Sequence, residues 1–353
     1  MLVKNLKLNN YRNYTKAEIF FDPNLNIIVG KNGIGKTNIL ESLILISNTK
    51  SFRTLNDQDL IKKNTEYLKI ECDTKTDNYK VVINQSGKKL YVNNIPIKKT
   101  SEFIGRVNCI LFKPSDLDLF NQSPKERRRL MDLEIGKVSK KYLDAILTYN
   151  LLLKDKNKLL KENNVDKTYL DLIEEQMIPK IKTIIEERED FINSINYFIS
   201  DYYNKISGKN SSIKIIYKKC CDIDSIKMMM EKNREKDLYY HYAYFGPHHD
   251  DYEFIMDGYA LNSIASQGQT RMVLIAFKLS LMKYIQNKTG NVPILLLDDI
   301  LSELDIENRE RLLKTIPKET QIIITGTDLE GMNIKSNFNL IELKEEQDGW
   351  DKN

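Results

Sequence analysis

The sequence has little cysteine and no long apolar run, and each absence excludes a class of protein. The chain has 353 residues and four cysteines, none of them in a C-x-x-C pair, so neither a zinc site nor a disulfide framework is expected. No window approaches the roughly 18 consecutive apolar residues of a membrane-spanning helix, and the N-terminal stretch lacks the apolar segment of a secretion signal. We therefore expect a soluble, cytoplasmic protein with no membrane partner.

Neither sign of charge is in large excess. Lysine and arginine number 54 against 50 for aspartate and glutamate, a formal net charge of +4, although 29% of the residues are charged. This balance excludes a histone-like binder and leaves nucleic-acid binding open. The length and the apolar fraction of 41% are sufficient for about two to three domains with real cores.

The strongest local signal is a glycine-rich segment, Gly30 to Thr37, that fits the pattern G-x-x-x-x-G-K-[ST] between a predicted strand and a predicted helix. In this pattern, successive backbone N–H groups surround nucleotide phosphates at a helix N-terminus. We predict that Lys36 contacts the outer phosphates and that the Thr37 hydroxyl is a ligand of Mg²⁺. The other residues of the predicted nucleotide-binding loop are Gly30, Lys31, Asn32, Gly33, Ile34, Gly35 and Asn38.

Two carboxylates follow a second apolar strand, residues 294–297. Because ligands bind at the carboxyl ends of the strands in a parallel sheet, Asp298 and Asp299 are predicted to lie beside the phosphate loop. We assign Asp298 to the Mg²⁺ and Asp299 to the attacking water. For an isolated Asp-Asp pair, a helix-capping turn is the alternative.

A third element, Ser266-Gln267-Gly268-Gln269, opens a long predicted helix upstream of the Asp298 strand. Ser266 and Gln269 also fit a capping box, so a purely local role is the alternative. The order of this element, the Asp298 strand, residues 302–305 and residues 325–328 nevertheless matches the signature, Walker B, D-loop and switch segments of ABC-type ATPases. We therefore predict a catalytic role for Ser266 and nucleotide contacts from Ser266, Gly268 and Gln269.

Several segments along essentially the whole chain together carry one resemblance. They are NYRNY (10–14), GKNGIGKTNILESL (30–43), FKPSDLDLFNQSPKERRRLMD (112–132), YFGPHHDDYEF (244–254), ASQGQTRMVLIAFKLSL (265–281), LLLDDILSELD (295–305) and ITGTDLE (324–330). With these segments the chain resembles the RecF group of bacterial recombination-repair proteins. The resemblance implies an ATP-dependent homodimer with weak ATPase activity and DNA binding, on double-stranded and gapped DNA. It also implies action with RecR and RecO at single-strand gaps and stalled forks to promote RecA loading.

The predicted fold is α/β, a P-loop ABC-type ATPase head with a parallel sheet, an antiparallel β-subdomain and an inserted helical lobe. Strand-like segments before residue 113 and βα patterns after residue 242 flank a mostly helical stretch, which opens with an N-cap at Ser123-Pro124. We expect the first part of the head in residues 1–120, the helical lobe in 121–240 and the second part of the head in 241–353.

The resemblance also implies a mechanism for motifs that are far apart in the sequence. In such heads two protomers sandwich ATP, so the helix opened by Ser266 of one chain would meet the γ-phosphate held by Lys36 of the other. Arg12 is expected to contact the nucleotide, and a surface arginine at a strand end is the alternative. Asp299 replaces a glutamate common in these heads, so an ATP-binding DNA scaffold with negligible hydrolysis stays open as a second function.

Two further groups of residues carry weaker expectations. Where the family usually has arginine after Gly-Pro-His, this chain has His249, so the fixed positive charge of arginine is replaced by an imidazole. A metal cluster of residues 248–251 is not favoured, since adjacent residues on a strand point apart. Basic side chains near and on the helical lobe are candidates for contacts with duplex phosphates, although the interleaved acidic residues favour a solvated helix face; they are Arg127, Arg128, Arg129, Lys137, Lys140, Lys141, Lys154, Lys156, Lys158 and Lys161.

Overall fold

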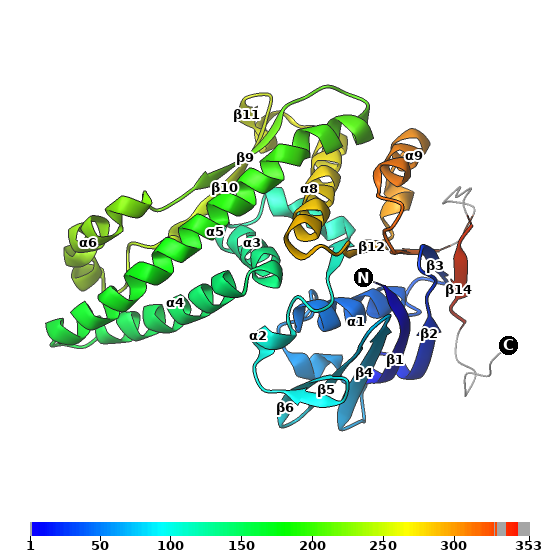
Figure 1. Cartoon of the computed structure of the whole chain (residues 1–353), viewed down its shortest axis with the longest axis horizontal. Coiled ribbons are helices and arrows are strands. Elements are labelled where there is room, and N and C mark those ends of the chain that lie inside the picture. Colours follow the sequence, from blue (N-terminus) through cyan, green and yellow to red (C-terminus); the bar gives the residue numbers. More distant parts are fainter. Residues whose placement is uncertain (1, 328, 330–336, 345–353) are drawn as a thin grey trace. The chain divides into compact units, whose positions relative to one another are not determined.

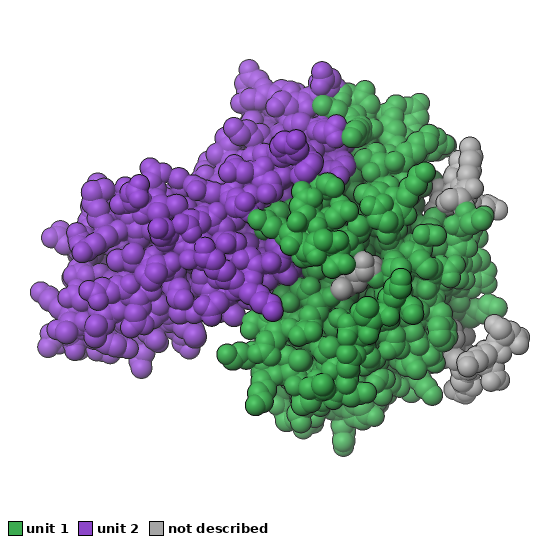
Figure 2. Space-filling model, in the orientation of Figure 1, with its two compact units in different colours: residues 1–116, 204–209, 274–353 green, residues 117–203, 210–273 purple. Residues whose placement is uncertain are grey.

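A computed structural model describes residues 2–327, 329 and 337–344 (Figure 1). The chain divides into two compact units, which Figure 2 shows in different colours. Unit 1 comprises residues 1–116, 204–209 and 274–353, and unit 2 comprises residues 117–203 and 210–273. The structure thus groups residues 241–273 with the helical lobe, whereas the sequence suggested the head. The physical reason is strand pairing, because β10 (Asp251–Met256) pairs with β9 (Ile213–Lys218) of the same unit.

The described part of unit 1 contains two sheets of different kinds. A five-stranded sheet has the order β14-β3-β13-β12-β8, with every neighbouring pair parallel. A six-stranded sheet has the order β2-β1-β4-β5-β6-β7 and is antiparallel. Their strands are β1 (Val3–Tyr11), β2 (Tyr14–Phe20), β3 (Leu25–Val29), β4 (Tyr67–Thr74), β5 (Asn78–Asn84), β6 (Gly87–Val92), β7 (Ile95–Ile97), β8 (Cys109–Phe112), β12 (Ile294–Asp298), β13 (Ile322–Gly326) and β14 (Asn339–Glu342).

Burial along the strands explains why the two sheets differ. All residues of β3 and β12 are buried, as expected for strands of a parallel sheet that is covered on both faces. Along β4 and β5, buried residues alternate with partly exposed ones, which is the pattern of an antiparallel sheet with one face toward the core. The predicted antiparallel β-subdomain is confirmed: β4 to β7 follow one another in it, and β1 and β2 extend it into one sheet.

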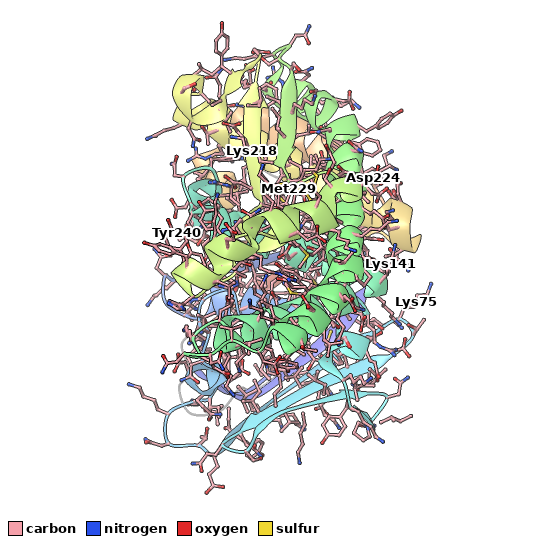
Figure 3. The ribbon with its side chains drawn as sticks, turned by 90° about the vertical axis from the view of Figure 1, so that its left-hand side faces the viewer. Lys75, Lys141, Lys218, Asp224, Met229 and Tyr240 are labelled. Carbon is pink, nitrogen blue, oxygen red and sulfur yellow. The ribbon has the colours of Figure 1, made fainter. Side chains whose placement is uncertain are left out.

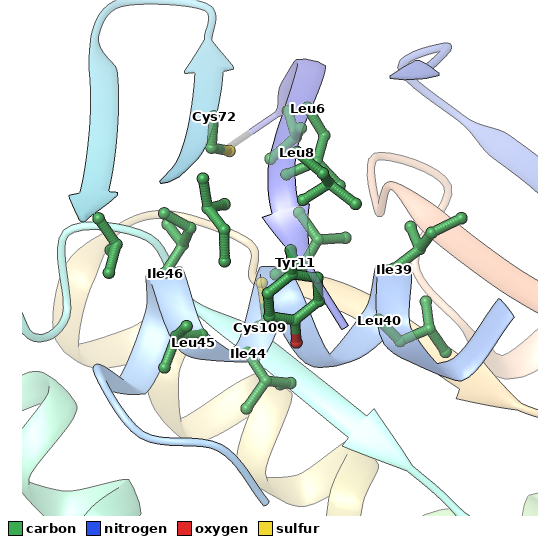
Figure 4. Close-up of a cluster of buried hydrophobic side chains, with 14 of the residues drawn as sticks. Leu6, Leu8, Tyr11, Ile39, Leu40, Ile44, Leu45, Ile46, Cys72 and Cys109 are labelled. Carbon is green, nitrogen blue, oxygen red and sulfur yellow. The ribbon is translucent and has the colours of Figure 1, made fainter. Parts of the chain in front are cut away.

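Helix α1 (Lys36–Asn48) contacts strands of both sheets, β8, β12 and β13 in one and β4 and β5 in the other. Apolar side chains of α1, such as Ile39 and Ile46, meet Leu6 and Leu8 of β1 and Cys72 of β4 in this core (Figure 4). The packing of α1 in this core therefore helps to hold the first residues of the helix in place, in addition to the glycine-rich loop that precedes them. The other helices with residues in unit 1 are α2 (Thr100–Phe103), α5 (Lys167–Ser207, from residue 204), α8 (Gln267–Thr289, from residue 274), α9 (Ile306–Thr315), η1 (Asp57–Leu60), η2 (Pro114–Phe120, to residue 116) and η5 (Ile300–Glu303).

Unit 2 is mostly helical and also contains a small antiparallel sheet of order β11-β10-β9. The predicted N-cap is confirmed, because the Ser123 hydroxyl accepts a hydrogen bond from the Glu126 N–H and Pro124 is the first helical residue. Strand β9 interrupts the stretch that the sequence predicts to be mostly helical. The remaining elements are α3 (Pro124–Val138), α4 (Lys140–Leu159), α5 (Lys167–Ser207, to residue 203), α6 (Ile226–Tyr240), α7 (Leu261–Ile264), η3 (Ile223–Ser225), η4 (Pro247–His249) and β11 (Tyr259–Ala260).

A buried arginine ties the elements of unit 2 together. Arg188 of α5 donates to the carboxylates of Asp132, at 2.8 Å, and Asp250, at 2.7 Å, and to the Pro247 carbonyl at 2.9 Å. Its side chain is 1% exposed and that of Asp250 is 0% exposed. Because a buried charge is costly unless it is paired and hydrogen-bonded, this network fixes α3, α5 and the start of β10 to one another.

In the ranges that the structure describes, every helix is too short or too polar to cross a bilayer.

Candidate nucleotide-binding site

The phosphate loop lies between β3 and α1, as the sequence predicts. Its backbone conformation requires glycine at Gly35, where φ is 119° and a Cβ atom would lie 2.6 Å from the Tyr14 hydroxyl oxygen. Residues 31–33 are exposed at the turn of the loop. The loop therefore presents accessible backbone to a ligand at the N-terminus of a buried helix, which is favourable for binding phosphate.

The ammonium of Lys36 lies across this loop. Its Nζ atom donates to the carbonyl of Gly30 at 2.6 Å and to that of Lys31 at 3.1 Å, and the residue is 5% exposed. An ammonium has three N–H donors, so this geometry leaves one for a phosphate oxygen. The loop thus positions the Lys36 ammonium for its predicted contact with phosphate.

The structure brings the two predicted Mg²⁺ ligands together. The Thr37 hydroxyl donates to Oδ1 of Asp298 at 3.0 Å, and the Thr325 hydroxyl donates to the same atom at 2.8 Å. Asp298 and Thr325 are neighbours because β12 and β13 pair in parallel register at these two residues. Burial raises the pKa of the Asp298 carboxyl, and the hydroxyls of Thr325 and Thr37 partly offset that rise. Hydroxyl and carboxylate oxygens are the ligands that a hard divalent cation prefers, so Thr37 and Asp298 fit Mg²⁺.

Asp299 directly follows this cluster in an unusual backbone conformation. Its φ is 54°, in the left-handed region, and its N–H donates to the Thr325 hydroxyl at 3.1 Å. It occupies the N-cap position of η5 but makes no side-chain cap hydrogen bond. A capping hydrogen bond from the Asp299 side chain therefore does not hold this residue in place. The role of Asp299 in orienting the attacking water stays a prediction.

Arg12 pairs with a residue that the sequence analysis missed. Its guanidinium contacts Glu41 of α1 through Nη2–Oε1 at 2.6 Å and Nε–Oε2 at 2.9 Å. The Tyr11 and Ser51 hydroxyls also donate to this carboxylate, at 2.9 and 2.5 Å. Burial opposes ionisation of Glu41, yet these hydrogen bonds and the charge of Arg12 lower its pKa. A nucleotide contact from Arg12 stays a prediction, and the surface-arginine alternative does not describe this ion pair.

A chain of amides joins the same turn to the phosphate loop. The Asn13 side chain donates to the Ile34 carbonyl at 2.7 Å, and the Asn38 side chain donates to Oδ1 of Asn13 at 2.7 Å. Arg53 then donates to Oδ1 of Asn38 at 2.7 Å. Sequence analysis named Asn38 but missed Asn13 and Arg53, whose only sequence signal is their polarity near the motif. The loop and the β1–β2 turn are thus positioned as one assembly.

Ser266 forms the local contacts of a capping box at the start of α8. Its N–H donates to Oε1 of Gln269 at 2.9 Å, and the Gln269 N–H donates to the Ser266 hydroxyl at 3.3 Å. Ser266 and Gly268 are exposed, and among the described residues no atom beyond the adjoining backbone of the helix would lie within 4 Å of a Cβ at Gly268. This helix N-terminus is open to a ligand, and its contact with nucleotide stays a prediction. Asp328 of the predicted switch segment lies outside the described residues.

The basic candidates of the helical lobe fall into two groups. Lys137 pairs with Glu134 at 2.8 Å, and Lys156 pairs with Glu174 at 2.9 Å and with Asp237 at 2.6 Å. Both lysines are buried, at 5% and 2% exposure, so the prediction of DNA contacts is wrong for these two, and neither lies on a solvated face. Arg127 also forms an ion pair, with Asp251, and Arg128 donates a hydrogen bond to the backbone carbonyl of Asp250. The candidates that are exposed are Arg129, Lys140, Lys141, Lys154, Lys158 and Lys161.

Residues 248–251 make contacts other than those of a metal site. Asp250 and Asp251 pair with Arg188 and Arg127, and His248 lies with its ring centroid 4.1 Å from that of His249. In the described ranges, His, Cys, Asp and Glu side chains form no group of three or more that could hold a metal ion.

Comparison with known proteins places this geometry in a family. The chain matches the RecF/RecN/SMC N-terminal domain over residues 2–350. It is 37% identical to the DNA replication and repair protein RecF of Streptococcus gordonii, over 97% of this chain and 98% of that protein. It is 35% identical to RecF of Bacillus subtilis, over 94% of this chain and 95% of that protein.

Solved structures agree with the sequence matches. The recombination mediator protein RecF with ATP, of the RecFOR pathway, superposes with a TM-score of 0.87 at 29% identity, covering 94% of this chain and 93% of that one. The Smc head domain from Pyrococcus furiosus gives a TM-score of 0.54 at 18% identity, covering 94% of this chain and 90% of that one, and so shares the fold. The predicted α/β head of the ABC ATPase type is confirmed. The chain belongs to the RecF family of DNA replication and repair proteins.

Proposed function

We propose that this protein is a DNA-binding ATPase that dimerises when it binds ATP and Mg²⁺, and that hydrolyses ATP slowly and faster on DNA. It would act at single-strand gaps and stalled forks with RecR and RecO to promote RecA loading. The proposal rests on the family and, in this chain, on the contact of Thr37 with Asp298 at the phosphate loop. The solved relatives are described as the recombination mediator protein RecF in the RecFOR pathway, and this supports RecR and RecO as partners.

The residues of the loop have distinct proposed roles toward ATP. The backbone N–H groups of residues 31–37 would bind the phosphates, and the Lys36 ammonium would share its third donor with them. Mg²⁺ held by Thr37 and Asp298 would neutralise phosphate charge. Asp299 would orient the attacking water, from a main chain that the Thr325 hydroxyl holds in place.

Dimerisation would supply the last contacts to the nucleotide. The exposed N-terminus of α8 carries the positive end of a 23-residue helix dipole, which favours a bound anion. In the proposed dimer, Ser266, Gly268 and Gln269 of one protomer meet the γ-phosphate held by Lys36 of the other. Loss of that phosphate on hydrolysis would remove the bridge and open the dimer, so that DNA is released.

A scaffold that binds ATP and DNA with negligible hydrolysis is the second candidate. The observation that favours it is Asp299, whose side chain is one methylene shorter than glutamate and which stands on a left-handed backbone position. Phosphate release by the parent protein on duplex DNA decides between the two candidates.

Mixing two inactive variants tests the shared site. We expect Lys36→Ala and Ser266→Arg each to abolish hydrolysis, and their mixture to restore part of it, because the heterodimer has one site with both native residues. Ser263→Arg, at an exposed serine of α7, is the matched control and should hydrolyse ATP like the parent. A mixture of folded variants that stays inactive would overturn the sandwich, provided that the parent is active.

A further inference from the structure

Unit 2 exposes a group of tyrosines that the proposed ATPase function does not use. Tyr239 and Tyr240 end α6, and Tyr242 and Tyr244 follow in the next loop; we call these four side chains the tyrosine cluster. Their exposed fractions are 77%, 52%, 42% and 44%. Figure 3 shows Tyr240 at one end of α6, with Met229 toward the other end. Four large aromatic side chains within six residues that remain outside the core require an explanation.

The rings are arranged for stacking. Tyr240 and Tyr244 are stacked, with centroids 6.0 Å apart and an interplanar angle of 23°. The Tyr242 ring lies 6.1 Å from the first and 6.2 Å from the second. The Lys236 ammonium sits 5.1 Å from the Tyr244 centroid, in a cation–π contact. An aromatic surface and a cation are therefore presented together.

Buried hydrogen bonds anchor the backbone that carries these rings. The Tyr244 N–H donates to Asp237 at 2.7 Å, and Asp237 pairs with the buried Lys156 at 2.6 Å. The Ala243 N–H donates to the Asn157 side chain at 2.7 Å. Since the main chain is already fixed, a ligand that stacks on the cluster would order little more of the protein on binding.

The charge of the segment suits a polyanion. Residues 239–249 contain no acidic residue, and Lys236 lies one helical turn before Tyr239 and Tyr240. The nearest preceding carboxylate, Asp237, is 1% exposed and bound to Lys156, so it offers little repulsion at the surface. Lys236 and His249 flank the Tyr244 ring, the latter with centroids 6.3 Å apart.

We propose that the tyrosine cluster is a binding site for single-stranded DNA, in which unpaired bases stack on Tyr240, Tyr242 and Tyr244 while Lys236 contacts the backbone phosphate. The inference rests on the proposed DNA-binding function and adds which form of DNA this surface takes. Bases in a duplex have their faces covered by their neighbours, whereas a single strand offers them to aromatic side chains. A protein partner is the competing occupant, and the Lys236 ammonium beside the rings, together with the lack of acidic residues in 239–249, favours DNA.

The test compares single-stranded and duplex DNA on the full chain. The probes are an oligo-dT that carries one 2-aminopurine, and a blunt duplex of the same length. We expect binding to quench the 2-aminopurine, and Tyr240→Ala/Tyr244→Ala to weaken single-strand affinity by roughly 10- to 100-fold with duplex affinity unchanged. Tyr240→Phe/Tyr244→Phe keeps both rings and should bind like the parent. Tyr197→Ala, at a tyrosine of α5 that is 80% exposed, is the matched control.

The outcomes separate this inference from the function on which it rests. Equal weakening of both forms of DNA by the double alanine variant, or no weakening of either, would overturn the stacking site, and the second result would point to a protein partner. If the parent itself binds no duplex, the proposed DNA-binding function fails as well. Because the rings are exposed, thermal unfolding of the alanine variant should match the parent, and the phenylalanine variant gives the same answer without loss of ring area.

Discussion

Each unit contains a buried charge with several polar partners, and the two networks differ in their access to solvent. In unit 1, Glu41 is fully buried, but its partner Arg12 keeps 20% of its side chain exposed and lies on the turn that joins the phosphate loop. In unit 2, Arg188 and Asp250 are both closed off from water. The difference indicates that the first network can respond to a ligand, whereas the second holds the lobe together.

The largest effect is expected from the closed network. Arg188→Leu leaves the Asp250 carboxylate buried without its cation, so the free energy of unfolding of unit 2 should fall by about 3–5 kcal/mol. ATP affinity at the phosphate loop should be unchanged. Urea unfolding and titration with a fluorescent ATP analogue measure the two quantities. Arg129→Leu, at an exposed arginine, is the control; a comparable loss in that variant would show that burial is not the cause.

Acid should weaken unit 2 through His248. Burial, with the neighbouring charge of His249 and more distant ones of Arg128 and Lys156, lowers the pKa of His248 to about 4. The unfolded chain therefore binds a proton that the folded chain does not, and stability present above pH 6.5 is lost as the pH falls toward 4, by roughly 3 kcal/mol in full. Urea unfolding at several pH values should give a shallower slope for His248→Gln. An unchanged slope would contradict this account, and His241→Gln is the control.

At the solvent-accessible site, the expected change is in binding and not in stability. Lys36→Ala removes a charge-assisted contact with phosphate, so ATP affinity should fall by about 100-fold while the free energy of unfolding changes by less than about 1 kcal/mol. Calorimetric titration measures the affinity. Lys31→Ala is the matched control in the same loop, because that residue is expected to bind phosphate through its backbone. Equal losses in the two variants would contradict a specific contact between the Lys36 side chain and phosphate.

The smallest expected effect separates capping from nucleotide contact. Ser266→Ala and Ser139→Ala each remove an N-cap hydroxyl, at α8 and α4, and each should cost about 1 kcal/mol of stability. Only Ser266→Ala should also weaken ATP-dependent dimerisation. If dimerisation is the same in both variants, Ser266 has a capping role alone.

The phosphate loop was predictable because all its determinants are local. Strand, glycines, Lys36 and Thr37 follow one another, and the apolar run before Asp298 indicates a parallel strand that ends near them. Thr325 and Glu41 were missed for different reasons. Thr325 reaches Asp298 only through the register of β12 and β13. Glu41 lies among the apolar residues of α1, and this one charged position was a signal that could have been used.

The division into units was harder to predict, because it depends on pairing between distant segments. Residues 251–256 have the alternating pattern of any half-buried strand, and only the partner, β9, assigns them to the lobe. Lys137 and Lys156 show the same limit, since their interleaved acidic neighbours suggest a solvated face. Their ion partners lie one helical turn away for Lys137 and on other helices for Lys156.

Sedimentation velocity with and without ATP and Mg²⁺ tests the central claim most directly. The parent protein should shift from monomer to dimer at saturating ATP, while Lys36→Ala should remain a monomer under the same conditions. A parent protein that stays monomeric at saturating ATP, with binding verified by titration, would contradict the account of the phosphate loop as a site completed by a second chain.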